Sequence, residues 1–417
     1  MKIAIIGGGP IGVEAALYAA QIGFEPQLFE LGRIGEAARR WGHVQMFTEW
    51  ARNRSPLGER LLRERGDNLP DASEFPSGND LADYLLRLVS LPQLKGRVLP
   101  QTRVLSLTRD GLNKSDFYGD PRRHSRPFRV LSKGVAGEKT RFFDAVLDCS
   151  GVYASPNNLG TGGARCAGET GLAPFIDYAI PDVLGAERGR FVSHHTLVVG
   201  SGHSAAQTAI SVAKLMESAP KTRLTWGVRR DLAFDGSLYA LDPNDISSGR
   251  RKLGETANAL AKGGKIELKI KTQISAVARK NGRFQVRFSD ETEAEFDNIC
   301  AHTGFRPDLE LWRELQIAAH PATDGPSRLA SAILGANRAA GVGISTGYAQ
   351  KLGDIEKPEA SENSDTRELL RLDEPNFHVL GIKSYGRDAG FLIGNGFHQI
   401  RDVFQILSGN EALDLYR

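Results

Sequence analysis

The arrangement of apolar and polar positions along the chain twice predicts a buried strand followed by a helix. Residues 3–6 form a short apolar run, as in a strand of a parallel sheet covered on both faces. A glycine-rich stretch follows, and the alanine-rich segment 13–22 predicts a helix. The same succession recurs from residue 196 to about residue 216. We therefore expect an α/β protein with two Rossmann-like strand–turn–helix units.

The other elements follow from the same patterns. Residues 32–60, 110–127, 231–250 and 353–373 are expected to be irregular or loop, the last of them because it is acidic and poor in apolar residues. A further strand and helix near the C-terminus complete the first unit, so the second unit is expected to be inserted within it. Strands are expected at 26–30, 98–108, 128–135, 143–149, 223–228, 266–270, 276–280, 284–288, 299–303 and 377–382, and helices at 81–91 and 397–407.

The first glycine turn reads Gly7-x-Gly9-x-x-Gly12, and it lies between a strand and a helix. Glycines at these positions permit a tight turn, a close approach of backbone to a pyrophosphate, and packing of the helix on the strand. Glu30 ends the next predicted strand, where a carboxylate would accept hydrogen bonds from ribose hydroxyls and repel a 2′-phosphate. This pattern favours FAD or NAD over NADP.

The second turn reads Gly200-x-Gly202-x-x-Ala205, with alanine in place of the third glycine. The strand after it is followed by Arg229 and Arg230 rather than by an acid. Guanidinium groups pair with phosphate in a bidentate way, so this turn predicts an NADPH site. One bound dinucleotide that receives hydride from another is the arrangement of a flavin-dependent oxidoreductase.

Composition narrows the remaining possibilities. The formal net charge of +3 gives no reason to expect nucleic acid or a membrane surface as a partner. The three cysteines, Cys149, Cys166 and Cys300, are far apart and form no Cys-x-x-Cys pair or metal-ligand pattern, so we expect buried thiols and no metal. No signal segment and no apolar run of spanning length is present, which favours a cytoplasmic protein.

Several segments resemble the flavin-containing and N-hydroxylating monooxygenases. Residues 148–151 (Asp-Cys-Ser-Gly) and 302–304 (His-Thr-Gly) stand where that family has alanine–threonine–glycine segments linking its FAD and NADPH domains. Residues 39–42 (Arg-Arg-Trp-Gly) resemble the tryptophan region beside the flavin, and 386–403 resembles the segment that closes the FAD site. The nearest substitutes for the family's C-terminal glycine–aspartate pair are residues 386–388 and 394–396.

The resemblance implies a glutathione-reductase-like flavoprotein fold, with a discontinuous FAD domain at 1–185 and 300–417 and an NADPH domain at 186–299. It implies a monooxygenase that transfers one oxygen atom from O2 to a small organic substrate through a flavin C4a-hydroperoxide. The candidate polar residues near the flavin are His43, Gln45 and Asn157. The expected cofactor contacts are Gly7, Gly9, Pro10, Ile11, Gly12, Glu30, Arg40, Trp41, Val104, Ser150, Gly151, Gly200, Gly202, His203, Ser204, Ala205, Arg229, Arg230, Gly304, Gly396 and Phe397.

Three other functions fit the two nucleotide turns to different degrees. An NADPH-dependent reductase that passes electrons to an acceptor such as a quinone would share every motif. A non-enzymatic redox module would bind both cofactors but show little NADPH turnover. A flavin disulfide reductase would need a redox-active cysteine pair, which the sequence lacks.

Overall fold

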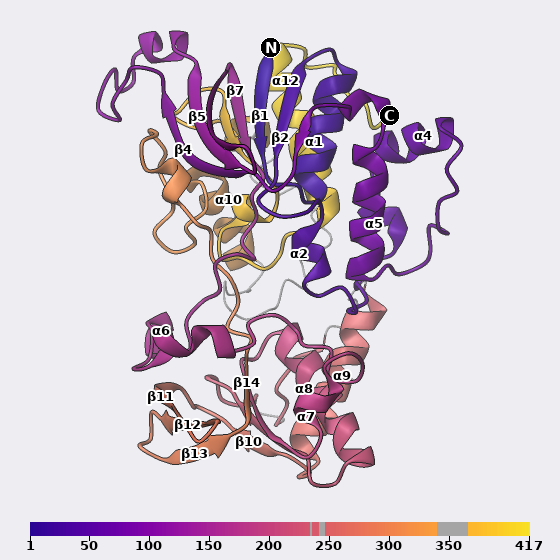
Figure 1. Ribbon diagram of the computed structural model, residues 1–417, viewed down its shortest axis with the longest axis vertical. Coiled ribbons are helices and arrows are strands. Elements are labelled where there is room, and N and C mark those ends of the chain that lie inside the picture. Colours follow the sequence, from indigo (N-terminus) through magenta and orange to yellow (C-terminus); the bar gives the residue numbers. More distant parts are fainter. Residues whose placement is uncertain (234–235, 242–246, 340–365) are drawn as a thin grey trace. The chain divides into compact units, whose positions relative to one another are not determined.

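The computed structural model describes residues 1–233, 236–241, 247–339 and 366–417, which fold into two compact units (Figure 1). The first unit is discontinuous and contains Met1–Ser155 and Arg306–Arg417, and the second is Pro156–Phe305. These limits differ from the expected domain limits, because residues 156–185 and 300–305 belong to the second unit. Isolated β-bridges join residues 160, 167 and 177 to residues 274, 276 and 300 of that unit.

A parallel sheet forms the centre of the first unit. Its strand order is β15-β7-β1-β2-β3, and all four pairings are parallel. The carboxyl ends of these strands therefore meet at one edge, where ligands bind in open α/β sheets. The strands are β1 (Lys2–Ile6), β2 (Glu25–Phe29), β3 (Val98–Leu99), β7 (Ala145–Asp148) and β15 (Phe377–Val379).

Both faces of this sheet are covered (Figure 1). Ile3 and Ile5 of β1 pack in one core with helices α1 (Pro10–Gln21), α5 (Gly78–Val89) and α12 (Ile393–Ser408). Ala4 and Ile6 point to the other face, where an antiparallel sheet made of β4 (Arg103–Arg109), β5 (Phe128–Gly134) and β6 (Gly137–Phe143) covers them. Burial on both faces explains why β1 is a continuous apolar run.

Shorter elements complete the first unit, and some of them correct the expectations from sequence. Residues 32–60 were expected to be irregular but contain three helices, and residues 98–108 form two strands in different sheets. Residues 353–365 of the expected loop at 353–373 lie outside the described residues. These elements are α2 (Glu36–Arg39), α3 (Trp50–Asn53), α4 (Pro56–Glu64), η1 (Pro92–Leu94), η2 (Pro121–Ser125), η5 (Glu310–Trp312), α10 (Ser327–Ala339), α11 (Thr366–Leu369) and η7 (Gly381–Tyr385).

The second unit repeats the plan of the first. A parallel sheet of order β10-β9-β8-β14 carries helix α8 on one face and an antiparallel sheet, β11-β12-β13, on the other. The sheet strands are β8 (His195–Val199), β9 (Arg223–Gly227), β10 (Glu267–Lys269) and β14 (Asn298–Ala301). The remaining elements are η3 (Thr161–Gly163), α6 (Glu169–Leu172), η4 (Ala173–Phe175), α7 (Arg188–Phe191), α8 (His203–Ser218), α9 (Ser248–Lys262), β11 (Ile274–Lys280), β12 (Arg283–Phe288) and β13 (Glu293–Phe296).

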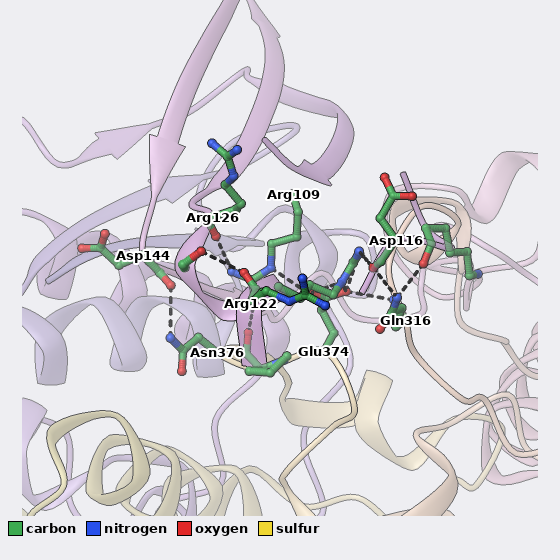
Figure 2. A network of polar contacts seen from close by, with 12 residues as sticks. Arg109, Asp116, Arg122, Arg126, Asp144, Gln316, Glu374 and Asn376 are labelled. Carbon is green, nitrogen blue, oxygen red and sulfur yellow. Dashed lines mark hydrogen bonds and ion pairs between the residues drawn. The ribbon is translucent and has the colours of Figure 1, made fainter. Parts of the chain in front are cut away.

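A buried ionic network joins the loop between β4 and β5 to the rest of the first unit (Figure 2). The carboxylate of Glu374 is fully buried and pairs with Arg109 at 2.7 Å and with Arg123 at 2.9 Å. It also accepts the backbone N–H of Gln316 at 2.9 Å. Because Arg123 belongs to η2, this network ties the expected loop at 110–127 to the strand-bearing core.

Candidate functional site

The glycine turn after β1 is shaped by contacts that leave no room for a larger residue. Gly7 has φ +110°, and a Cβ placed on it would collide with the carbonyl group of Cys149 at the end of β7. A Cβ on Gly12 would collide with the carbonyl oxygen of Gly7. Both positions therefore require glycine, one for its backbone conformation and the other for close packing of α1.

The N-terminus of α1 is open above this turn. Its cap residue is Gly9, which provides no side-chain hydrogen bond, and the first turn contains no acidic residue. A Cβ on Gly9 would meet no atom within 4 Å. Helix N-terminal N–H groups with a positive dipole end and open space in front of them suit a phosphate group. The residues present thus fit the pyrophosphate of a dinucleotide.

Glu30 lies beside this turn and its orientation is fixed by two backbone donors. Its carboxylate accepts the N–H of Gly8 at 2.6 Å and the N–H of Gly32 at 2.7 Å. The negative charge therefore stands next to the glycine turn, at the end of β2. A carboxylate accepts hydrogen bonds only, so this position favours a ligand hydroxyl and disfavours a second phosphate.

A buried cluster that the sequence did not reveal lies under the next turn, Ser150–Gly151. Asp148 ends β7, and its carboxylate receives Lys383 Nζ at 2.7 Å and Trp312 Nε1 at 2.8 Å. The Ser150 hydroxyl donates to the same carboxylate at 2.6 Å and accepts from Lys383 at 3.0 Å. Burial would raise the pKa of Asp148, but the Lys383 charge and these hydrogen bonds outweigh it, so the pKa lies below its ordinary value.

A glycine in the same region, Gly381, follows the last strand of the sheet. Gly381 comes two residues after β15, has φ +73°, and a Cβ there would press on Ile11 at 3.1 Å. Gly381 is therefore a further candidate for the family's C-terminal glycine, beside the substitutes expected at 386–388 and 394–396. No acid follows it directly, because the next residues are Ile382 and Lys383.

The second unit has a matching glycine turn after β8. Gly200 has φ +125°, and a Cβ on it would collide with the carbonyl oxygen of His302 after β14. Gly202 caps α8 without a side-chain hydrogen bond, no acid lies in the first turn, and a Cβ on Gly202 would meet nothing within 4 Å. Ala205 is fully buried. This turn also fits a pyrophosphate.

Two aromatic side chains brace this second turn, and two arginines stand near it. Trp226 Nε1 donates to the carbonyl oxygen of Gly200 at 2.9 Å, and the Tyr239 hydroxyl donates to that of Gly202 at 3.0 Å. Arg229 is exposed after β9, whereas Arg230 is half-buried with its guanidinium 5.4 Å from the centre of the Tyr239 ring. His203 and Ser204 begin α8 beside the turn.

The three candidate polar residues expected near the flavin do not all lie in one unit. His43 and Gln45 are exposed in the first unit, and Gln45 donates to the carbonyl oxygen of Phe75 at 3.2 Å. Asn157 lies in the second unit, where it donates to the carbonyl oxygen of Thr303 at 3.1 Å and its N–H donates to that of Gly304 at 2.9 Å. These contacts connect the beginning of the second unit to the segment that follows β14.

The remaining expected cofactor residues of the first unit have mixed surroundings. Arg40 is exposed, Val104 is buried in β4, and Phe397 is buried in α12. Gly396 serves packing, because a Cβ there would collide with the side chain of Ile11. The indole N–H of Trp41 is buried and has no hydrogen-bond partner among the described residues. A buried donor without a partner fits a site completed by a ligand.

None of the three cysteines is placed for thiol chemistry. Cys149 lies in the first unit, Cys166 and Cys300 lie in the second, and all three are buried and unpaired. Burial raises the pKa of Cys149 and of Cys300 well above the ordinary value, and it raises the pKa of Cys166 to about 12. Thiols of this kind are inert at neutral pH.

Comparison with known proteins agrees with this geometry. Residues 4–115 match the family described as pyridine nucleotide-disulphide oxidoreductase. The gamma-glutamylputrescine oxidoreductase of Escherichia coli (strain K12) is 22% identical over 211 residues, 48% of this chain and 49% of that protein. The match therefore spans about half the length of this curated relative. Among the described residues, no helix is long and apolar enough to cross a membrane.

Solved structures resemble nearly the whole chain. The bacillithiol disulfide reductase Bdr of Bacillus cereus has a TM-score of 0.68 at 17% identity and covers 99% of this chain and 100% of its own. The FAD-bound cadaverine monooxygenase DfoA of Erwinia amylovora has a TM-score of 0.63 at 12% identity, covering 99% and 95%. A flavin-containing monooxygenase of Stenotrophomonas maltophilia has a TM-score of 0.55 at 16% identity, covering 97% and 98%.

These likenesses confirm the expected fold class, an α/β fold of two-domain flavoproteins, and the resemblance of the chain to flavin monooxygenases. The family matched by residues 4–115 is one of oxidoreductases, and the proteins of similar fold include both reductases and monooxygenases.

Proposed function

We propose that this protein is an FAD-containing, NADPH-dependent monooxygenase that transfers one oxygen atom of O2 to a small organic substrate. The observation that carries the proposal is the pair of open glycine turns, with Glu30 beside one and Arg229 and Arg230 near the other. FAD, when bound, supplies hydride acceptance and oxygen chemistry that no side chain provides. The residues of the chain bind and orient both nucleotides.

The assignment of one nucleotide to each turn rests on charge. Glu30 would accept hydrogen bonds from a ribose, as FAD requires, and its charge opposes a 2′-phosphate. A guanidinium at the corresponding place of the second unit attracts a 2′-phosphate, which distinguishes NADPH from NADH. The Asp148–Lys383 cluster would keep the Ser150–Gly151 turn in position at the FAD edge of the sheet.

The cysteines favour a monooxygenase over a disulfide reductase that cycles its own thiols. Such a reductase needs an accessible thiolate, and each of the three thiols is buried with a raised pKa. A reductase that passes electrons to a quinone is the second candidate. The similarity to Bdr in fold supports a reductase in general but carries no preference for its electron acceptor.

The decisive experiment follows the fate of electrons and oxygen in the purified full-length protein. FAD content is measured first, and reduction of the flavin absorbance by NADPH and by NADH is then compared without oxygen. NADPH oxidation in air is next run with a panel containing a primary amine, a thioether and a cyclic ketone under isotopically labelled O2. A monooxygenase incorporates one labelled atom into one of these compounds and releases less hydrogen peroxide per NADPH when that compound is present.

Two results would overturn the proposal. Purified protein that neither retains added FAD nor accepts electrons from NADPH would exclude a flavoenzyme of this kind. Rapid quinone reduction without oxygen, together with complete recovery of NADPH electrons as hydrogen peroxide across the panel, would identify a reductase.

A further inference from the structure

The two arginines after β9 have different surroundings, although the sequence presents them as a pair. Arg229 is exposed. Arg230 is half-buried, donates to the carbonyl oxygen of Leu238, and lies over the ring of Tyr239 at 5.4 Å. A guanidinium within about 6 Å of an aromatic ring centre gains cation–π attraction. Arg230 is therefore engaged by residues 238–239, whereas Arg229 faces solvent.

Tyr239 connects Arg230 to the pyrophosphate turn. Its hydroxyl donates to the carbonyl oxygen of Gly202, the cap residue of α8, at 3.0 Å. Its ring lies 6.3 Å from the ring of His203, the first residue of that helix. A fixed Gly202 carbonyl fixes the peptide planes around it, and these carry the N–H groups that would face a phosphate.

Helix α9 holds Tyr239 from the other side. Asn258 accepts the backbone N–H groups of Leu238 and Tyr239 at 2.9 and 2.8 Å, and donates to the Tyr239 carbonyl oxygen at 2.7 Å. All three contacts are buried. The backbone of Tyr239 is thus bound at both its donor and its acceptor, so the side chain projects from a rigid base.

We propose that the two arginines have separate functions: Arg229 selects the 2′-phosphate of NADPH, while Arg230 and Tyr239 are positioning residues that hold the pyrophosphate turn. This inference rests on the proposed NADPH site and assigns its coenzyme selectivity to one residue. Selectivity between NADPH and NADH then depends on Arg229 alone, because the pyrophosphate turn contacts a part that both coenzymes share.

The experiment measures the dissociation constants of NADP⁺ and NAD⁺ for the full-length protein by calorimetry, so that no turnover occurs. The variants are Arg229→Leu, Arg230→Leu and Tyr239→Phe. Arg223→Leu is the matched control, because Arg223 is exposed at the opposite end of β9 and its loss changes the net charge equally. The thermal midpoint of each variant is recorded to separate unfolding from weakened binding.

Arg229→Leu should weaken NADP⁺ binding by about 10- to 100-fold, the loss of a charge-assisted phosphate contact, and leave NAD⁺ binding unchanged. Tyr239→Phe should weaken both nucleotides by the same factor of about 2 to 10, the loss of one hydrogen bond, so that the ratio of the two constants stays constant. Arg230→Leu should behave as Tyr239→Phe does.

Three outcomes overturn the inference. If Arg230→Leu lowers the preference for NADP⁺ as strongly as Arg229→Leu, Arg230 contacts the phosphate directly. If Tyr239→Phe leaves both constants unchanged, the contact with Gly202 has no positioning function. If the parent protein binds neither nucleotide, the proposed NADPH site fails together with this inference, whereas the first two outcomes leave the proposed function standing.

Discussion

Replacing Lys383 with methionine should destabilise the first unit, because the buried carboxylate of Asp148 loses its counter-charge. Lys383→Met removes the ammonium group 2.7 Å from the Asp148 carboxylate while keeping most of the side-chain volume. The side chains of Lys383 and Asp148 are 1% and 0% exposed, so water cannot replace the lost partner. Loss of one partner from a buried pair costs about 3–5 kcal/mol. Hydrogen bonds from Ser150 and Trp312 remain, and we therefore expect about 3 kcal/mol.

A double-mutant cycle measures this coupling directly. Urea unfolding of the parent, Lys383→Met, Asp148→Asn and the double variant is followed by tryptophan fluorescence and circular dichroism, with separate transitions allowed for the two units. The double variant contains no buried charge at this place, so it should be more stable than the sum of the single changes predicts by about 2 kcal/mol or more. Lys139→Met, an exposed change in β6, is the control.

The pH dependence gives a second measure of the same cause. In the parent the pKa of Asp148 lies below its ordinary 3.8, so its contribution to stability is present above that value and is lost as pH falls through the lowered pKa. Without Lys383, burial raises the pKa of Asp148 instead, and the destabilisation should diminish as the pH falls from neutral. Two results would refute this reasoning. One is a free energy of unfolding for Lys383→Met within about 1 kcal/mol of the parent value, and the other is a double variant whose destabilisation equals the sum of the two single changes.

Three further predictions concern other positions of the first unit. Gly9→Ala should change the free energy of unfolding by less than about 1 kcal/mol, because its methyl group meets only open space. It should nevertheless weaken FAD binding in a fluorescence titration, because that space is where the pyrophosphate is proposed to bind. Gly12→Ala places a methyl group against the Gly7 carbonyl oxygen and should destabilise the protein by about 1–3 kcal/mol. Glu374→Gln leaves two buried arginines without a counter-charge, so it should cost about 3 kcal/mol and accelerate proteolysis within residues 110–127; unchanged cleavage would contradict this. Burial raises the pKa of Glu14 to about 7, so the folded state binds a proton more tightly than the unfolded state and stability should fall by about 3 kcal/mol as pH rises from 4.5 to 7. In Glu14→Gln, a plot of melting temperature against pH should be flatter between pH 4.5 and 7. A parent protein whose melting temperature is constant over this range would contradict the raised pKa of Glu14.

Local patterns in the sequence predicted the parts of the fold that short-range physics determines. The apolar run expected to form the first strand, residues 3–6, lies within β1 (Lys2–Ile6), and the glycines at 7, 12 and 200 have the tight turns or close contacts expected of them. The helix of the first turn begins at Pro10 rather than at residue 13, because proline with its fixed φ is well suited to the first helical position.

Other features could not be predicted from the sequence. Some depend on residues far apart in the chain, and others are elements with few apolar residues. β6 has five polar or glycine residues among its seven, so it lacks the alternation of apolar positions that indicates a strand. α9 contains few apolar residues and was not expected. Lys383 and Asp148 are separated by 235 residues, and no local pattern could reveal that one side chain neutralises the other. The difference between Arg229 and Arg230 likewise depends on Tyr239, which no motif connects with them.

The discontinuous first unit has a consequence for the order of events during synthesis on the ribosome. Asp148 is made 235 residues before Lys383, and the second unit is synthesised entirely between them. At about 5–20 residues per second, the acid waits about 10–50 s for its partner. During that interval the second unit can complete its core, whereas the sheet of the first unit still lacks β15 and the covering helix α12. With the nucleotides assigned as proposed, the nascent chain is expected to complete its NADPH-binding unit before its FAD-binding unit, although the first glycine turn is synthesised earlier.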